Sequence, residues 1–280
     1  MTEVGNPAGA NGYIEIANTS LKMGRVEHVL FDFDGTISLI REGWQNIMVP
    51  MMVEELMKTP NHEEEAELEE HVREFVYVLT GKDTIFQMMR LAEEVEKRGA
   101  KALEPLDYKR EYHRRLWERI EHRVAGLKAG KIEPRDMVVP GAIDLLEELH
   151  RRGLKMYLAS GTDHCYVADE AAALGVDKFF GEHIYGALDN YWERSKAQVI
   201  ADILTKNNLH GNSLMAFGDG YVEIENCKDA GGTAVGVASD EEKRTGIDQW
   251  KRERLIRAGA DVIIPDFSNV PALAAFFFGE

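Results

Sequence analysis

The chain has 280 residues, enough for about two compact domains. Its composition, 44% hydrophobic and 29% charged with only two cysteines, excludes disordered, collagenous and small disulfide-stapled proteins. Forty-nine acidic against 33 basic residues give a formal net charge of −16, which repels nucleic acids and anionic lipid. We therefore expect no nucleic-acid partner and no membrane partner, whereas local cations or a metal ion can still bind a small phosphorylated ligand.

The two cysteines, Cys165 and Cys227, are typical of an intracellular protein with reduced thiols. No stretch approaches the roughly 20 apolar residues that cross a bilayer. The N-terminal residues lack the basic start and apolar core of a secretion signal. The sequence therefore predicts a cytoplasmic protein, as a monomer or a homodimer.

In chain order, residues 1–25 are rich in Gly and Asn and predict a loosely held arm that can add an edge strand. The apolar run at 26–36 is typical of a buried parallel strand that ends in a loop. Comparable strands are predicted at 154–160, 213–219, 232–238 and 261–265, and helices at 141–152, 164–174, 195–207 and 249–258. This alternation predicts an α/β fold with a doubly wound, mainly parallel, Rossmann-like sheet, whose ligands bind at the carboxyl ends of the strands.

A helical unit interrupts this pattern. Residues 41–138 show no strand-like alternation but long helical periodicity, which predicts an inserted all-helical cap domain. The catalytic core is then formed by residues 26–40 and 139–280. Within the cap, the acidic run that begins at Glu63 and the basic residues from Lys109 to Arg123 are interpreted as solvated helix faces.

Two carboxylates directly follow the first predicted core strand. Asp32 and Asp34 stand two residues apart, so alternation places them on the same side of the chain. Carboxylates at such a buried position require a cation or backbone N–H groups nearby, which favours a chemical role over a structural one. One can attack a substrate while the other handles its proton. Gly35 allows a close approach of an anion, and the Thr36 hydroxyl can donate to it.

The other strand ends supply matching groups. Ser160 and Gly161 offer a hydroxyl and N–H groups at the start of a predicted helix, an arrangement that binds anions. Asp219 adds a third carboxylate at the same sheet edge, and Lys196 begins the helix that precedes that strand. None of these signals is specific alone, but their order along the chain is.

The four motifs together resemble those of the haloacid dehalogenase superfamily, in its phosphatase branch with a helical cap after the first motif, as in phosphoglycolate phosphatase and β-phosphoglucomutase. Asp32–Thr36 resembles the first motif, the residues around Ser160 the second, Lys196 the third, and Gly218–Glu223 the fourth.

The resemblance implies a role for each matching residue. Asp32 is expected to form an aspartyl phosphate, and Asp34 to act as general acid and then as general base. Lys196 is expected to neutralise the anionic site. Phosphate-binding groups are expected from Gly35, Thr36, Ser160 and Gly161, in addition to Lys196.

The resemblance also implies Mg²⁺ as cofactor, held by Asp32, Asp219 and the Asp34 carbonyl. Few hard oxygen ligands with several retained waters suit Mg²⁺ better than Ca²⁺ or Zn²⁺. The chain departs from the family at Glu223, where an Asp is usual. Glu223 can reach the metal directly, orient a water, or leave that role to Glu225.

In the cap, Leu79–Met89 resembles the substrate-reading loop of the β-phosphoglucomutase branch, so Gly81 and Lys82 are candidate specificity residues. The same stretch also fits an ordinary turn between two helices.

The predicted function is Mg²⁺-dependent hydrolysis of a small phosphorylated metabolite, a sugar phosphate or a phosphoglycolate-like molecule. A β-phosphoglucomutase-like phosphomutase is an alternative with the same motifs. A non-catalytic metabolite-binding protein is a further one, suggested by Glu223. Dehalogenase chemistry is disfavoured, because it uses neither the metal nor the second acid.

Overall fold

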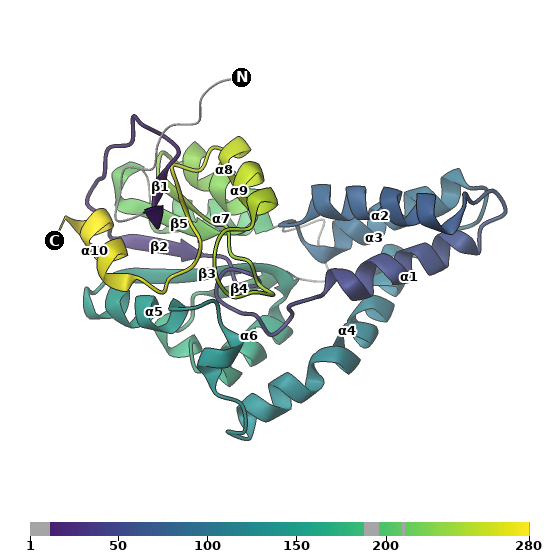
Figure 1. Ribbon diagram of the computed structural model, residues 1–280, viewed down its shortest axis with the longest axis horizontal. Helices are drawn as coiled ribbons and strands as arrows, with labels where there is room; N and C mark the ends of the chain where they lie inside the picture. The colour runs from purple at the N-terminus through teal and green to yellow at the C-terminus, as the bar shows by residue number, and fades with distance from the viewer. Residues whose placement is uncertain (1–11, 188–195, 209–210, 280) are drawn as a thin grey trace.

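The computed structural model describes residues 12–187, 196–208 and 211–279. Their core is a seven-stranded sheet in the order β1-β7-β6-β5-β2-β3-β4 (Figure 1). The strands from β2 onward are parallel, and β1 pairs antiparallel with β7 at one edge. Their bounds are Glu15–Ile16 (β1), His28–Phe31 (β2), Lys155–Asp163 (β3), Ile184–Ala187 (β4), Leu214–Gly218 (β5), Thr233–Val237 (β6) and Val262–Ile264 (β7).

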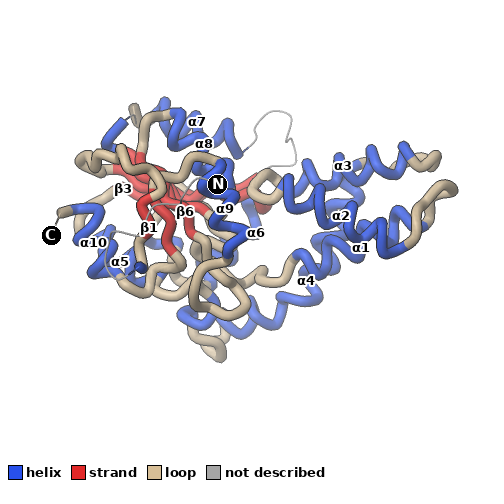
Figure 2. The backbone as a smooth tube through the Cα atoms, turned by 45° about the horizontal axis from the view of Figure 1, so that its top comes forward, coloured by secondary structure: helices blue, strands red, loops and turns tan. Residues whose placement is uncertain are grey.

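Alternation along the strands divides the core between two faces of the sheet. On β2, Val29 and Phe31 pack with the helices α5 and α6 and the C-terminal α10, whereas Leu30 packs with α7, α8 and α9. Helices therefore cover both faces, as Figures 1 and 2 show. Their bounds are Ala142–Arg151 (α5), His164–Ala173 (α6), Lys196–Lys206 (α7), Tyr221–Asp229 (α8), Gln249–Arg257 (α9) and Val270–Phe278 (α10). The predicted doubly wound α/β class is confirmed.

The arm is held more firmly than expected. From Gly12 onward it docks on the sheet through β1, and Ile14 is fully buried. The Tyr13 hydroxyl donates to the Asp266 carboxylate at 2.7 Å.

The helical lobe lies beyond the carboxyl end of β2 (Figure 1). Where the chain enters and leaves this lobe, its two segments run side by side: Leu39 N–H donates to the Met137 carbonyl, and Val139 N–H to the Ile37 carbonyl, both at 2.9 Å. The four helices of the cap are Gln45–Met57 (α1), Glu65–Leu79 (α2), Thr84–Lys97 (α3) and Pro105–Lys128 (α4).

Three described elements, β4, α8 and α10, are not predicted from the sequence. The basic residues of α4 are not all solvated as predicted, because Lys109 is 4% exposed and pairs with Asp163 of the core. Arg123 donates to the Ile40 carbonyl at 2.8 Å. These cations fasten α4 to the loop after β2 and to β3. No helix in the described part of the chain is long and apolar enough to cross a membrane.

Glu94 is the centre of an ion-pair cluster inside the cap. Its side chain is 4% exposed and is contacted by Arg98 at 2.6 Å, Arg90 at 2.7 Å, Lys97 at 2.9 Å and His71 at 3.1 Å. Burial raises the pKa of Glu94, but these hydrogen bonds outweigh it and lower the pKa from 4.5 to about 2.

We expect Glu94→Gln to lower the free energy of unfolding by roughly 2–3 kcal/mol at pH 7. Because the folded-state pKa lies below the ordinary value of 4.5, this stabilisation is complete above that value and is lost as the pH falls toward about 2. Thermal melts of both proteins from pH 7 to pH 3 measure the difference. Glu69→Gln, which removes an exposed pair with Arg73, is the control and should be nearly neutral. A difference that does not shrink on acidification contradicts the prediction.

Candidate active site

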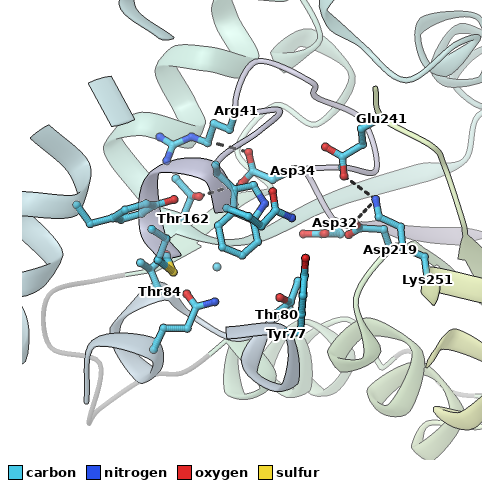
Figure 3. Close-up of a pocket in the computed structure, with 18 of the residues that line it drawn as sticks. Asp32, Asp34, Arg41, Tyr77, Thr80, Thr84, Thr162, Asp219, Glu241 and Lys251 are labelled. Carbon is cyan, nitrogen blue, oxygen red and sulfur yellow. Dashed lines mark hydrogen bonds and ion pairs between the residues drawn. The ribbon is translucent and has the colours of Figure 1, made fainter. Parts of the chain in front are cut away.

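The carboxyl ends of β2, β3 and β5 meet the cap around one cavity of about 110 Å³. Asp32 and Asp34 reach it from the end of β2, Gly161 and Thr162 from β3, and Asp219 from the end of β5 (Figure 3). Since β2 lies between β3 and β5, parallel pairing brings these ends together. The three aspartates that the sequence singled out therefore share one cavity.

Backbone pairing holds Asp32 in place. The Asp32 N–H donates to the Phe217 carbonyl at 3.0 Å, which continues the β2–β5 ladder by one residue. Asp32 is 5% exposed. Asp32 is thus held at the end of a buried strand, with its side chain at the cavity.

Gly35 and Thr36 support Asp219. Gly35 has φ +76°, and a Cβ atom there would lie 2.4 Å from Asp219 Oδ2, so only glycine fits. Thr36 is fully buried, and its Oγ1 accepts the Asp219 N–H at 3.0 Å. In this structure Thr36 therefore fixes the β5 loop and does not line the cavity, whereas the sequence predicts it as a phosphate-binding residue.

Two hydroxyls hold Asp34. Ser160 Oγ donates to Asp34 Oδ2 at 3.2 Å, and Thr162 Oγ1 donates to the same oxygen at 2.9 Å. Ser160 is 2% exposed and also accepts the Thr162 N–H at 3.0 Å. Ser160 therefore contacts the expected acid rather than the cavity, which Gly161 lines instead. Thr162 is not among the site residues predicted from the sequence.

A buried arginine that the sequence does not single out, Arg41, lies on the other side of Asp34. Arg41 Nη2 lies 2.7 Å from Glu170 Oε1, Nε lies 3.1 Å from the same oxygen, and Nε is also 3.8 Å from Asp34 Oδ1. Burial disfavours its charge, but Glu170 and Asp34 outweigh burial and raise the pKa of Arg41. Arg41 and Glu170 are 129 positions apart, so no local pattern relates them.

A second buried cation, also missed, contacts Asp219. Lys251 of α9 lies 2.8 Å from Asp219 Oδ2 and 2.6 Å from Glu241 Oε1 (Figure 3). Burial disfavours the ammonium, but Asp219 and Glu241 outweigh it and raise the pKa of Lys251, so Lys251 stays charged. Glu241 comes from the loop after β6, in a charged run that looks like an ordinary surface segment.

The remaining sequence-predicted residues lie elsewhere or outside the described part. α7 begins at Lys196, but the structure does not describe the Lys196 side chain. Glu223 is fully buried beneath the β5 loop, where a Cβ atom on Gly218 would lie 2.9 Å from its Oε2. Glu225 and Lys82 line a different hollow with α8. The structure thus puts neither Glu223, Glu225 nor Lys82 at the cavity.

Glycines let the cap turn approach the core. Gly81 lines the cavity, and a Cβ atom there would lie 3.2 Å from the Gly220 Cα. A Cβ atom on Gly161 would lie 2.8 Å from the Lys82 carbonyl oxygen. The turn at 80–83 therefore packs directly on the backbone of β3 and of the loop after β5.

We expect Gly161→Ala to lower kcat/KM roughly 10- to 100-fold, because the cap turn must shift away from the reacting groups. Steady-state kinetics on the best substrate measure the effect. Gly153→Ala is the control: its site has open space but φ +76°, so it should lower the melting temperature and leave KM unchanged. Wild-type kinetics for Gly161→Ala would contradict the proposed fit.

The donor set at the cavity suits Mg²⁺. Asp32 and Asp219 provide carboxylate oxygens, and the Asp34 carbonyl is the third protein ligand that the resemblance implies. No group of three His, Cys, Asp or Glu side chains placed to hold a metal occurs in the described part of the chain. The expected site needs only two such side chains and a carbonyl, with waters completing the shell, so the residues present fit it.

Comparisons with known proteins show the family of the chain. A family model described as haloacid dehalogenase-like hydrolase matches residues 26–231. No curated protein matches the chain significantly.

Solved structures share the fold at low sequence identity. A predicted phosphoglycolate phosphatase from Haemophilus somnus is 16% identical with a TM-score of 0.58, over 90% of this chain and 100% of that one. β-Phosphoglucomutase from Clostridium difficile is 15% identical with a TM-score of 0.57, over 88% of this chain and 93% of that one. CbbY from Rhodobacter sphaeroides, solved in complex with phosphate, is 19% identical with a TM-score of 0.54, over 88% of this chain and 96% of that one. Because the family model covers most of the chain, the protein belongs to the haloacid dehalogenase-like hydrolases.

Proposed function

We propose that this hydrolase is a Mg²⁺-dependent phosphatase that acts on a small phosphorylated metabolite through an aspartyl phosphate on Asp32. The observation that supports the proposal most is the convergence of Asp32, Asp34 and Asp219 on one cavity beneath the cap. A phosphatase needs a nucleophile, a proton donor and cations for the developing charge, and this cavity holds candidates for each.

In the first step, a carboxylate oxygen of Asp32 attacks phosphorus, and the bond from phosphorus to the alcohol oxygen breaks. Asp34 donates a proton to the leaving oxygen, held in place by the Ser160 and Thr162 hydroxyls. In the second step, Asp34 takes a proton from water, which attacks phosphorus and releases phosphate from Asp32. When bound, Mg²⁺ would neutralise phosphoryl oxygens that otherwise repel the attacking carboxylate.

Buried charges position Asp34 and Asp219. Arg41 and the two hydroxyls fix the Asp34 carboxylate, and Lys251 fixes one oxygen of Asp219. The cap turn covers the cavity and excludes bulk water while the phosphate is transferred. Lys196 remains a proposed phosphate ligand at the start of α7, and we expect the protein to act in the cytoplasm.

A screen of phosphorylated metabolites with the full-length protein tests the proposal. We expect phosphate release in the presence of Mg²⁺ and its loss in excess EDTA, with recovery when Mg²⁺ is restored. An absence of phosphate release from every phosphoester in a broad panel would overturn it.

A further inference from the structure

The cap contributes an uncharged wall to the cavity. Apart from Arg41, which precedes α1, the described cap residues that line it carry amide, hydroxyl, thioether or aromatic groups or are glycine, and none of them is acidic or basic. The amides and the hydroxyl of α1 and α3 can donate to and accept from alcohol groups. They are Gln45, Thr84 and Gln87.

Aromatic rings face the same space. Trp44 and Tyr77 come from the cap and Trp250 from α9, and the Tyr77 and Trp250 rings lie 5.0 Å apart. Aromatic faces with a few polar groups form a typical site for a carbon skeleton whose apolar C–H surface alternates with hydroxyls.

The charged side chains that the structure describes at the cavity leave no unpaired cation for a second anion. Among the described lining residues, four are carboxylates (Asp32, Asp34, Asp219 and Glu241) and two are cations. Both cations are already paired: Arg41 with Glu170, and Lys251 with Asp219 and Glu241.

Lys82, the cation of the cap turn, does not line the cavity. Lys82 is exposed, its Nζ is 5.8 Å from the Phe86 ring centroid, and it lines the hollow beside α8. A substrate bound in the cavity therefore meets the backbone of this turn at Gly81 rather than the Lys82 ammonium.

We propose that the substrate is the monophosphate of an uncharged, hydroxylated alcohol, such as a neutral sugar or polyol, and not a phosphorylated carboxylic acid or a bisphosphate. This inference rests on the proposed phosphatase function. A carboxylate or second phosphate on the leaving group would lose its water beside four carboxylates, with both described cations already paired.

The same charges favour a phosphatase, which transfers the phosphoryl group to water, over a phosphomutase, which transfers it back to the substrate. A phosphomutase must bind a doubly phosphorylated intermediate, so its cavity needs a second cationic position opposite the reacting aspartate. The described wall opposite Asp32 is neutral, and the reaction therefore ends with transfer to water: one phosphate and one neutral alcohol are released.

Pairs of substrates with related carbon skeletons, one neutral and one anionic outside the reacting phosphate, test the inference. The pairs are 2-hydroxyethyl phosphate with 2-phosphoglycolate, glycerol 3-phosphate with 3-phosphoglycerate, glucose 6-phosphate with 6-phosphogluconate, and fructose 6-phosphate with fructose 1,6-bisphosphate. With Mg²⁺ present, we expect kcat/KM to be roughly tenfold or more higher for the neutral member of each pair that is turned over. Preference for the anionic members, or isomerisation of a hexose phosphate without phosphate release, would overturn it.

Two variants test whether the neutral lining of the cap causes the preference for neutral substrates. Gln45→Lys adds a cation to the lining and should shift the kcat/KM ratio toward the anionic members by roughly tenfold or more. Asn46→Lys adds the same charge at the next residue, which is exposed and does not line the cavity, and should leave the ratio within about twofold. If Gln45→Lys does not fold, Thr84→Lys adds the cation from α3. An equal shift in both variants contradicts the inference.

These outcomes are distinct from failure of the proposed function. If the protein releases phosphate but prefers the anionic substrates, the phosphatase proposal remains valid and only the proposed substrate class is wrong. Release from no member of any pair, nor from p-nitrophenyl phosphate and acetyl phosphate, contradicts the phosphatase and this inference together.

Discussion

Asp32→Asn is expected to lower kcat by roughly 10³-fold or more, because an amide cannot attack phosphorus as a carboxylate does. The fold should persist, since Asn has nearly the same shape and the backbone bond from Asp32 N–H to Phe217 remains. Phosphate release under saturating substrate and Mg²⁺ measures the loss, and a thermal melt within a few degrees of wild type checks the fold.

Two controls sharpen this test. Asp144→Asn removes an exposed carboxylate that pairs with Arg135, and it should leave kcat within about twofold. In wild type, rapid quenching with substrate labelled in the phosphoryl group should trap label on the protein, whereas Asp32→Asn should trap none. Appreciable turnover by Asp32→Asn would show that another group attacks.

Arg41→Met is expected to destabilise the protein by about 3–5 kcal/mol, because it leaves the buried Glu170 carboxylate without its bidentate partner. It should also reduce kcat, since one of the groups that fix Asp34 is lost. Chemical denaturation and steady-state kinetics measure the two effects. Arg135→Met, which breaks an exposed pair, should change stability by less than about 1 kcal/mol.

The double variant Arg41→Met/Glu170→Gln separates stability from positioning. Removing both charges should recover most of the stability, because no buried charge remains unpaired. Turnover should stay low, because Asp34 still lacks its guanidinium. Recovery of stability and activity together would show that Arg41 acts only as a structural partner of Glu170.

The alternation of apolar strands and amphipathic helices was enough to predict the sheet, its mainly parallel order and the helical insertion. These signals are local, because a strand buried on both faces and a helix with one apolar face show their periodicity in neighbouring residues. β4 and α8 lacked such a signal. β4 has four residues, three of them only partly buried, and α8 directly follows the Gly218–Gly220 loop with a mixed polar pattern.

The candidate acids could likewise be found from the sequence, since carboxylates directly after buried strands are costly and therefore informative. Asp32, Asp34 and Asp219 reach one cavity because parallel strands end at one edge of the sheet. Side-chain direction within a loop was harder to predict. Ser160 contacts Asp34 and Thr36 contacts Asp219 instead of lining the cavity. The Lys82 side chain lines a different hollow, and its neighbour Gly81 lines the cavity.

By itself, the sequence determined the fold class, and it predicted the helical insertion and the three aspartates, because periodicity and strand-end chemistry are properties of short segments. Only the tertiary structure decided which charges surround them. Arg41 with Glu170, and Lys251 with Glu241, look like ordinary charged surface residues until the chain folds. The free energy of a buried charge depends on partners brought from distant parts of the chain, and no local pattern encodes those partners.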